Sequence, residues 1–257
     1  MLEIDLSGKV ALVTGGSRGI GAAITRTLCS AGARVIFTHT GSPEHAFGVD
    51  ALVAGVRDAG GQVEAVAIDA VDSAGTADLA GRIVGQYGKL DILVCNVGKN
   101  PARPAETVTD EEWSRLIDLN LTSVFYAVRS VLPPMIDAGY GRIILVGSSA
   151  AFDGGGGAID YAAAKSGLVG MMLYLTKNYT RRGIITNTVH PCVIETDLLR
   201  ERYSNEEDKA KLVSQIPAGR LGRPEDVAGM VAYLASSWGD YICGQSILLD
   251  GGRTLGR

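Results

Sequence analysis

The sequence predicts an α/β protein built on a doubly wound sheet of seven mainly parallel strands, with helices on both faces. Short runs rich in valine and isoleucine alternate with longer segments of helical period, the order that builds such a sheet. Runs such as residues 92–95 are apolar throughout, as expected for strands buried on both faces. A glycine-rich segment at residues 14–21 joins the first run to a helical segment, which is typical of a three-layer, Rossmann-type arrangement.

Local signals mark the individual elements. A cap followed by proline at residues 42–43 and a capping box at residues 109–112 predict two helix starts. Four glycines at residues 154–157 predict a flexible loop just before the helix of Tyr161. Because no repeat or low-complexity linker divides the sequence, we expect one domain over residues 1–257. The expected strands are residues 10–13, 34–38, 62–68, 92–95, 142–146, 184–189 and 246–249.

Composition narrows the possible functions. With 257 residues, 46% hydrophobic and 20% charged, the chain can bury a large core. The net charge is −4 and no run of five or six like charges occurs, so nucleic-acid or anionic membrane binding is not expected. No apolar run is long enough to span a bilayer, and we expect a soluble cytoplasmic protein. The four cysteines form no close pair and are interpreted as buried thiols, without a metal site.

The glycine segment predicts a dinucleotide site. It follows an apolar run and precedes a helical segment, and its glycines permit a tight turn. Backbone N–H groups and the positive end of the helix could then approach a pyrophosphate closely.

The end of the second strand decides between the two nicotinamide dinucleotides. A carboxylate there would accept hydrogen bonds from the adenosine ribose and repel a 2′-phosphate. Residues 37–40 contain no acidic side chain, and Arg18 in the glycine segment could pair with a phosphate. The local charge therefore favours NADP(H), with NAD(H) possible. Two plainer interpretations stay open, Arg18 as a solvated loop residue and His39 as an ordinary surface histidine.

A tyrosine and a lysine four residues apart, Tyr161 and Lys165, follow Ser148 along the chain. Residues at this spacing on a helix share one face, so the phenol and the ammonium would be neighbours. Bringing a tyrosine pKa from about 10 to about 7 takes roughly 4 kcal/mol, which the lysine and a positive nicotinamide could jointly supply. Tyr161 is therefore a candidate acid or base for hydride-transfer chemistry, although the pair alone is a weak signal.

Together these motifs resemble the short-chain dehydrogenase/reductase family, in its compact single-domain branch, from about Leu6 to Gly252. The nearest resemblance is to 3-oxoacyl-carrier-protein reductases and related carbonyl reductases. Besides the glycine segment, the matching features are Asp69 after the third strand, the segment at residues 95–98, Asn120, Ser148, and Tyr161 with Lys165.

The resemblance implies a catalytic set of Asn120, Ser148, Tyr161 and Lys165. Tyr161 would donate the proton to a carbonyl oxygen on reduction, and Ser148 would hydrogen-bond that oxygen. Lys165 would hold the nicotinamide ribose and acidify the tyrosine, while Asn120 would hold a water on the proton path. The cofactor contacts that the resemblance implies are Gly15, Ser17, Arg18, Gly19, Ile20, Gly21, His39, Thr40, Asp69, Ala70, Asn96, Val97, Gly98, Tyr161, Lys165, Pro191, Ile194 and Thr196.

Several of these residues have plainer interpretations, and three positions depart from the family pattern. Asn96 and Asn120 could merely bridge local backbone, Asp69 could end a strand, and Thr196 could cap a helix. The departures are Val97 where the family has alanine, Cys192 where it has glycine after Pro191, and His190 just before Pro191. A side chain at Cys192 restricts the backbone and weakens the transfer of roles to Ile194 and Thr196. We interpret Cys192 as a packing thiol, rather than as part of a nucleophile pair or metal site with His190.

We therefore expect an NADP(H)-dependent oxidoreductase that interconverts a small carbonyl compound and an alcohol, with Tyr161 as acid or base. An alternative is a 3-oxoacyl-carrier-protein reductase, for which Arg129 and residues 181–182 could meet an acidic carrier. A non-catalytic dinucleotide-sensing protein belongs to another class, and the presence of the complete catalytic set disfavours it.

Loops beyond the strand ends should contact the substrate, namely residues 99–101, 152–157 and 197–216. The charged side chains of the last segment are more typical of a solvated helix than of a ligand clamp. The resemblance also implies a homotetramer, assembled through the long helices near Asn120 and Tyr161 and through the final strand.

Overall fold

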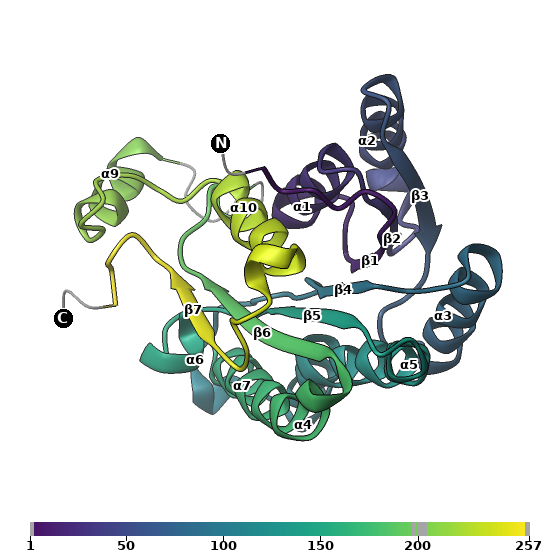
Figure 1. Cartoon of the computed structure of the whole chain (residues 1–257). Helices are drawn as coiled ribbons and strands as arrows, with labels where there is room; N and C mark the ends of the chain where they lie inside the picture. Colours follow the sequence, from purple (N-terminus) through teal and green to yellow (C-terminus); the bar gives the residue numbers. More distant parts are fainter. Residues whose placement is uncertain (1–2, 197–198, 200–204, 255–257) are drawn as a thin grey trace.

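The computed structural model describes residues 3–196, 199 and 205–254, which are gathered around one seven-stranded sheet (Figure 1). The strand order is β3-β2-β1-β4-β5-β6-β7, and every neighbouring pair is parallel. The chain runs outward from β1 to β3 and then crosses to β4, so the order reverses between β1 and β4. A ligand crevice is expected at the carboxyl ends of these two strands. The strands are β1 Val10–Thr14, β2 Arg34–His39, β3 Gln62–Ala67, β4 Ile92–Cys95, β5 Gly141–Val146, β6 Ile184–Pro191 and β7 Ser246–Leu249.

All seven predicted strands are present, two of them with the predicted bounds. The largest difference is at β6, which continues past Val189 to Pro191. The prediction stopped there because His190 and Pro191 do not continue a typical strand pattern. In the structure Pro191 pairs with Leu249 of β7, and the N–H of Cys192 donates to the Leu249 carbonyl at 3.0 Å. Pairing with a strand almost sixty residues away therefore sets this boundary.

Helices cover both faces of the sheet, as predicted (Figure 1). The first face carries α1, α2 and α10, and the second carries α3, α5 and α7. The longer helices are α1 Gly19–Ser30, α2 Ala46–Asp58, α3 Ser73–Tyr87, α4 Asp110–Ile117, α5 Ser123–Ala138, α7 Ile159–Tyr179, α9 Glu206–Ser214 and α10 Pro224–Ala235. The short elements are η1 Pro43–His45, η2 Ala105–Thr107, η3 Asp118–Thr122, α6 Ala150–Asp153, η4 Thr180–Arg182 and η5 Ser237–Gly239.

The strands feed two hydrophobic cores, one under each helical layer. Successive side chains of a strand point to opposite faces, so Val13 and Val94 enter the first core while Leu12 and Leu93 enter the second. Both faces are therefore apolar along the same strand. This explains why the sequence shows uninterrupted apolar runs rather than alternation.

The two predicted helix caps have different outcomes. Thr109 forms the predicted capping box, in which its hydroxyl accepts from the Glu112 N–H and Glu112 accepts from the Thr109 N–H. Pro43 occupies the first turn of η1, but the Ser42 hydroxyl donates to the Glu44 carboxylate at 3.1 Å instead of capping the backbone.

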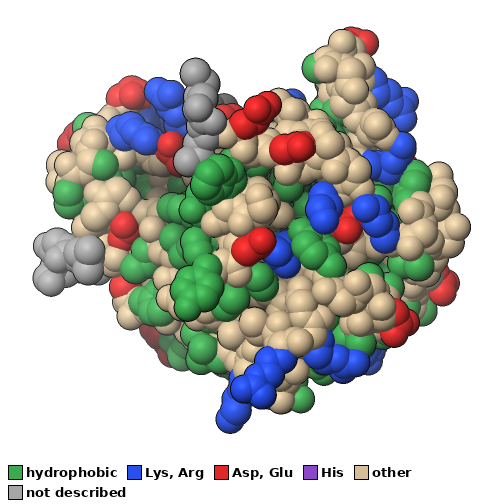
Figure 2. Space-filling view, viewed as in Figure 1, with side chains coloured by type: hydrophobic (Ala, Val, Ile, Leu, Met, Phe, Trp, Pro, Cys, Tyr) green, Lys and Arg blue, Asp and Glu red, His purple; other side chains and the backbone are tan. Residues whose placement is uncertain are grey.

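No helix in the described part of the chain is long and apolar enough to cross a membrane. In the space-filling view, hydrophobic side chains gather over α10 and β7 (Figure 2). The connection between these two elements exposes two aromatic side chains, Trp238 and Tyr241.

Gly183 closes the tight junction between the last turn of α7 and β6. Its φ of +82° lies in the left-handed region, and a Cβ there would collide with the Gly139 carbonyl oxygen. The Gly183 carbonyl in turn accepts a hydrogen bond from the Gly141 N–H at 3.1 Å, which starts the pairing of β5 with β6.

Replacing this glycine should destabilise the fold. We expect Gly183→Ala to lower the free energy of unfolding by at least about 2 kcal/mol, because it combines an unfavourable φ with a backbone collision. Gly170→Ala is the matched control, since this position lies mid-helix in α7 with open space around it. The control should raise stability by about 0.5–1 kcal/mol. Urea unfolding measures both, and equal midpoints for the two variants would contradict this account.

Candidate active site

The glycine turn between β1 and α1 has the geometry of a backbone cradle. Gly15 and Gly19 adopt φ values of +64° and +50°, which only glycine adopts without strain. At Gly21 a Cβ would collide with the Gly15 carbonyl oxygen, so helix and turn approach each other through bare backbone. Ser17 and Ile20 lie in the same turn. The predicted glycine cradle is therefore present at the carboxyl end of β1.

The N-terminus of α1 is open to an anion. Its cap residue, Arg18, has an extended backbone, and no side chain among the described residues caps the helix there. The first turn also contains no acidic residue. The positive end of the helix dipole and its unpaired N–H groups are thus available for a phosphate.

The end of β2 lies beside this turn. The Gly16 N–H donates to the Thr38 carbonyl at 3.0 Å, and the Gly15 N–H donates to the Thr38 hydroxyl at 3.2 Å. His39 and Thr40 follow, and Thr40 and Arg18 are both exposed. No carboxylate occurs between residues 37 and 41. The glycine turn that carries Arg18 is therefore bonded to a strand end without a carboxylate, which would not repel a 2′-phosphate.

Asp69 and Ala70 follow β3 at the same edge of the sheet. The Asp69 carboxylate accepts from the Val71 N–H at 3.1 Å, so it stabilises the turn that follows β3. Ala70 lines a small cavity together with Thr14 and Thr38, at the carboxyl ends of the first strands.

Asn96 and Val97 hold β4 against the glycine turn. The Asn96 side-chain amide donates to the Gly15 carbonyl at 2.8 Å, and its backbone N–H donates to the Thr14 hydroxyl at 3.2 Å. A Cβ on Gly15 would lie 3.0 Å from the Val97 side chain, so these two residues are in close contact. Asn96 thus holds the backbone of the glycine turn in place through two hydrogen bonds.

Gly98 allows two catalytic candidates to meet. A Cβ at this position would lie 2.8 Å from Oδ1 of Asn120 and 3.2 Å from Nζ of Lys165. Any side chain there would separate or displace those groups. The glycine therefore brings η3 and α7 together at the end of β4.

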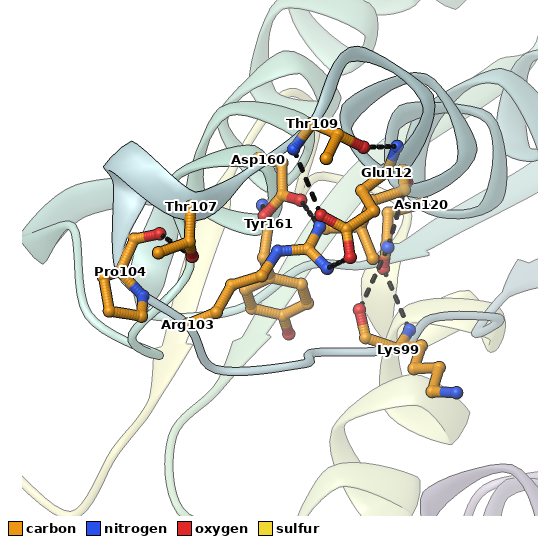
Figure 3. A network of polar contacts seen from close by, with 10 residues as sticks. Lys99, Arg103, Pro104, Thr107, Thr109, Glu112, Asn120, Asp160 and Tyr161 are labelled. Atoms are coloured by element: carbon orange, nitrogen blue, oxygen red, sulfur yellow. Dashed lines mark hydrogen bonds and ion pairs between the residues drawn. The ribbon is translucent and has the colours of Figure 1, made fainter.

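Asn120 occupies η3, a π-helical turn between α4 and α5, and its side chain is completely buried. Its amide donates to the Lys99 and Leu116 carbonyls, both at 3.1 Å, and its Oδ1 accepts from the Lys99 N–H at 3.2 Å (Figure 3). Both amide hydrogens are therefore in use. A water on the predicted proton path would have to bind Oδ1 or the Lys99 carbonyl.

Lys165 is 3% exposed and donates from Nζ to the Val146 carbonyl at 3.0 Å. Burial lowers the pKa of Lys165 to about 8. Nζ lies 5.8 Å from the centre of the Tyr161 ring, so the predicted helical spacing does place the two groups side by side.

The pKa of Tyr161 differs from the expectation. Burial raises the pKa of the phenol, and the hydrogen bond with the Ser148 side chain opposes this without overcoming it. The expectation made Lys165 and a positive nicotinamide joint causes of a lowered pKa, whereas among the protein groups alone the effect of burial on the Tyr161 pKa is the larger one. The reason is that burial disfavours the phenolate, and it weakens the charge of the lysine as well.

Ser148 rests on His190, a role that sequence reasoning missed. His190 is completely buried; its Nδ1 lies 3.2 Å from the Ser148 nitrogen and 3.0 Å from the Ser148 oxygen of the backbone. Its Nε2 lies 2.8 Å from the Thr188 hydroxyl, and burial lowers the pKa of the imidazole. Among the described residues, no group of three or more His, Cys, Asp or Glu could hold a metal ion.

The backbone restriction expected at Cys192 occurs in the segment after β6, at the next residue. Within the described residues, Val193 is the only non-glycine with positive φ, at 50°. The restriction therefore falls one residue after the glycine replacement, on a β-branched residue that rarely adopts this conformation. Cys192 is buried, and an Nη1 of Arg253 lies 3.5 Å from its sulfur.

The remaining candidates of this segment approach the glycine turn. Pro191 ends β6, and Ile194 is buried in an isolated bridge with Gly222. A Cβ on Gly19 would lie 3.2 Å from the Thr196 methyl group, so Thr196 reaches the start of α1.

The predicted substrate segments are placed only in part. Residues 197–198 and 200–204 lie outside the described residues. The following helix α9 pairs Lys209 with Glu206 and Lys211 with Glu207 on its surface, which agrees with a solvated helix. The glycine loop at residues 154–157 is tied down rather than free, because its backbone accepts hydrogen bonds from Asn100 and Arg103.

Comparison with known proteins agrees with this geometry. A family model described as enoyl-(acyl carrier protein) reductase matches residues 15–254. The 3-oxoacyl-acyl-carrier-protein reductase FabG of Escherichia coli (strain K12) is 38% identical over 249 residues, which cover 97% of this chain and 98% of the relative. This chain belongs to the short-chain dehydrogenase/reductase family. It is an oxidoreductase that acts on a carbonyl or CH–OH group and binds a nicotinamide dinucleotide.

Solved structures of other short-chain dehydrogenases share the fold. A Beutenbergia cavernae protein, provisionally assigned as an NAD(P)-dependent gluconate 5-dehydrogenase and solved with NADP at low occupancy, has a TM-score of 0.91 and 33% identity. That similarity covers 99% of this chain and 100% of the other. A short-chain dehydrogenase/reductase of Serratia marcescens has a TM-score of 0.88 and 39% identity, over 97% and 99% of the two chains.

The buried lysine of this short-chain dehydrogenase should leave a signature in stability. The pKa of Lys165 is about 8 in the folded protein, below its ordinary value of 10.5. Between these pH values the unfolded chain binds more protons, so stability rises with pH through this window. We expect the free energy of unfolding of the wild type, relative to Lys165→Met, to increase between pH 8 and 10.5 by up to about 3 kcal/mol. A pH-independent difference in urea unfolding would contradict the burial of a charged lysine.

Proposed function

We propose that this short-chain dehydrogenase/reductase uses NADP(H) to interconvert a small carbonyl compound and an alcohol, with Tyr161 as the acid or base. The observation that carries this proposal is the convergence of the Ser148 hydroxyl, the Tyr161 phenol and the Lys165 ammonium at the ends of β4, β5 and β6. A single domain over residues 1–257 would then carry both the dinucleotide and the catalytic groups.

The protein groups divide the work of the reaction. The bound dinucleotide supplies or accepts the hydride. In reduction, Tyr161 gives its proton to the substrate oxygen, and Ser148 holds that oxygen beside the phenol through its hydroxyl. Lys165, with a pKa of about 8, can pass a proton toward Tyr161 near neutral pH. Acid–base help of this kind contributes roughly 10²–10⁴ in rate.

The cofactor site fits a phosphorylated dinucleotide. The cradle of Gly15, Gly19 and Gly21 leaves space where a Cβ would otherwise stand, and the N-terminus of α1 is open to a pyrophosphate. The exposed Arg18 and the absence of a carboxylate at residues 37–41 support a preference for NADP(H). The low-occupancy NADP in the Beutenbergia cavernae structure supports it too.

Two substrate classes follow from different observations. The curated relatives support reduction of a 3-oxoacyl group on a carrier protein. The structural similarity to a provisional gluconate 5-dehydrogenase supports a free hydroxy acid or polyol. Arg181 and Arg182, suggested as carrier contacts, lie in η4 after α7, whereas Tyr161 lies in its first turn. A helix of 21 residues spans roughly 30 Å, so this pair is remote from the site. Arg129, the third suggested contact, donates to the Ser73 hydroxyl at 2.8 Å, and we favour the free substrate.

We also propose a homo-oligomer, as the family resemblance implies. Large exposed hydrophobic side chains lie on the elements expected to form its contacts: Phe125 on α5, Leu173 and Tyr174 on α7, and Trp238 and Tyr241 before β7. Exposed apolar groups at such sites are typical of protein–protein contacts.

Cofactor preference is tested by fluorescence titration with NADPH and NADH. We expect NADPH to bind the wild type more tightly, and Arg18→Ala to weaken NADPH by roughly tenfold while leaving NADH within twofold, because a charge-assisted contact to the 2′-phosphate is lost. Equal losses of affinity for NADPH and NADH would show that Arg18 does not contact the 2′-phosphate.

Turnover tests the role of Tyr161. Tyr161→Phe should lower kcat by about 10²–10⁴ while leaving the NADPH dissociation constant within twofold, since only the hydroxyl is removed. Tyr87→Phe is the matched control, because this tyrosine ends α3 and its hydroxyl donates to the Glu64 carboxylate at 3.4 Å. The assay follows NADPH absorbance against ketones, 3-oxoacyl thioesters and sugar acids. Unchanged turnover in Tyr161→Phe would remove the residue from its proposed role.

A further inference from the structure

The segment between β4 and α4 crosses the active site and is tied to it at several points. Residues 98–109 are called the active-site loop here. At one end the backbone of Lys99 is held by Asn120 on both its N–H and its carbonyl. Further along, the Asn100 side chain donates to the Gly156 carbonyl at 3.0 Å, and the Arg103 N–H donates to the Gly157 carbonyl at 2.8 Å. The loop therefore joins two sides of the site.

Arg103 is the strongest of these ties. Its guanidinium contacts the Asp160 carboxylate at 2.5 Å through Nη2 and the Glu112 carboxylate at 3.1 Å through Nη1 (Figure 3). The Asp160 side chain has no exposure to solvent, and that of Arg103 is only 19% exposed. A buried carboxylate is costly without a partner, and the Arg103 guanidinium supplies an ion-pair partner to Asp160.

Asp160 links this ion pair to the catalytic tyrosine. It immediately precedes Tyr161 in the first turn of α7, and its second carboxylate oxygen accepts from the Tyr161 backbone N–H at 2.9 Å. One carboxylate thus binds the active-site loop with one oxygen and the backbone of Tyr161 with the other. Any movement of the Arg103 side chain is passed to the start of the catalytic helix.

We propose that Arg103 and Asp160 are positioning residues for Tyr161. Their ion pair fixes the active-site loop to the first turn of α7, and the guanidinium cancels a negative charge one residue away from the phenol. This inference rests on the proposed acid–base role of Tyr161.

The effect of the Arg103 charge on Tyr161 can be measured separately from its effect on the loop. Within the described part of the chain, the ionisable groups around this part of the site include Arg103 from the active-site loop, Glu112 from α4, Asp160 and Lys165 from α7, His190 from β6 behind Ser148, and Cys192 after β6. Without Arg103, the buried Asp160 carboxylate would lose its ion-pair partner, at the backbone end of Tyr161 (Figure 3). A like charge disfavours the phenolate, which is the form that removes a proton during alcohol oxidation.

The test is the pH profile of alcohol oxidation in four proteins. We expect Arg103→Met to lower kcat by about 10- to 100-fold, with the KM for NADP⁺ within twofold, and to move the rising limb of the profile to higher pH. The double variant Arg103→Met/Asp160→Asn should return the limb to its wild-type position while recovering only part of kcat. It removes the unpaired charge but not the loss of the loop contact. Arg103→Lys should keep the wild-type profile with an intermediate kcat.

Arg82→Met is the matched control, because Arg82 forms an exposed pair with Glu64 at 3.1 Å, on α3 and β3. It should behave as the wild type. If Arg103→Met does not fold, as judged by circular dichroism, the lysine variant carries the test through its reduced kcat. Wild-type kcat and profile in Arg103→Met would overturn the inference, as would equal losses in the single and double variants with no movement of the limb.

The failure of this inference can be separated from failure of the proposed function. If Tyr161→Phe is inactive while Arg103→Met matches the wild type, only the positioning role is wrong. If Tyr161→Phe keeps its turnover, the acid–base assignment is wrong and the positioning inference fails with it.

Discussion

The active site depends on keeping an ammonium and a phenol together out of water. Lys165 is 3% exposed, and its ammonium donates to the Val146 carbonyl at 3.0 Å. Burial lowers the pKa of this lysine and raises the pKa of Tyr161, so neither group is in its most stable environment. Such a pair persists only where the surrounding fold fixes it. The seven-stranded sheet supplies that rigidity, because the groups stand at the ends of three central strands.

Small and polar residues far from one another in the chain maintain this arrangement. Gly98 leaves the space in which Asn120 and Lys165 approach each other, and His190 supports the backbone of Ser148 from within the core. Asn96 fastens the glycine turn to β4 in the same way. Each of these contacts involves a residue of the candidate active site. Stability and function are therefore joined through the same buried hydrogen bonds.

The parts of the fold that depend on local sequence were predictable, and those that depend on distant partners were not. Apolar runs fixed the seven strands, and the spacing of Tyr161 and Lys165 placed them on one helical face. The end of β6 was not predictable, because pairing with β7 extends the strand to Pro191.

Residue roles that depend on partners distant in the chain were also not predicted from the sequence. His190 bonds to a residue 42 positions away, and Arg103 pairs with one 57 positions away, so no local pattern announces either contact. The direction of the Tyr161 pKa also escaped prediction, since only the fold reveals how deeply the phenol is buried. Ultraviolet difference titration of wild type against Tyr161→Phe, with and without NADP⁺, tests this central point most directly. The account predicts that Tyr161 ionises above the ordinary tyrosine range in the protein alone and at clearly lower pH with NADP⁺. An equally low pKa in both states would contradict it.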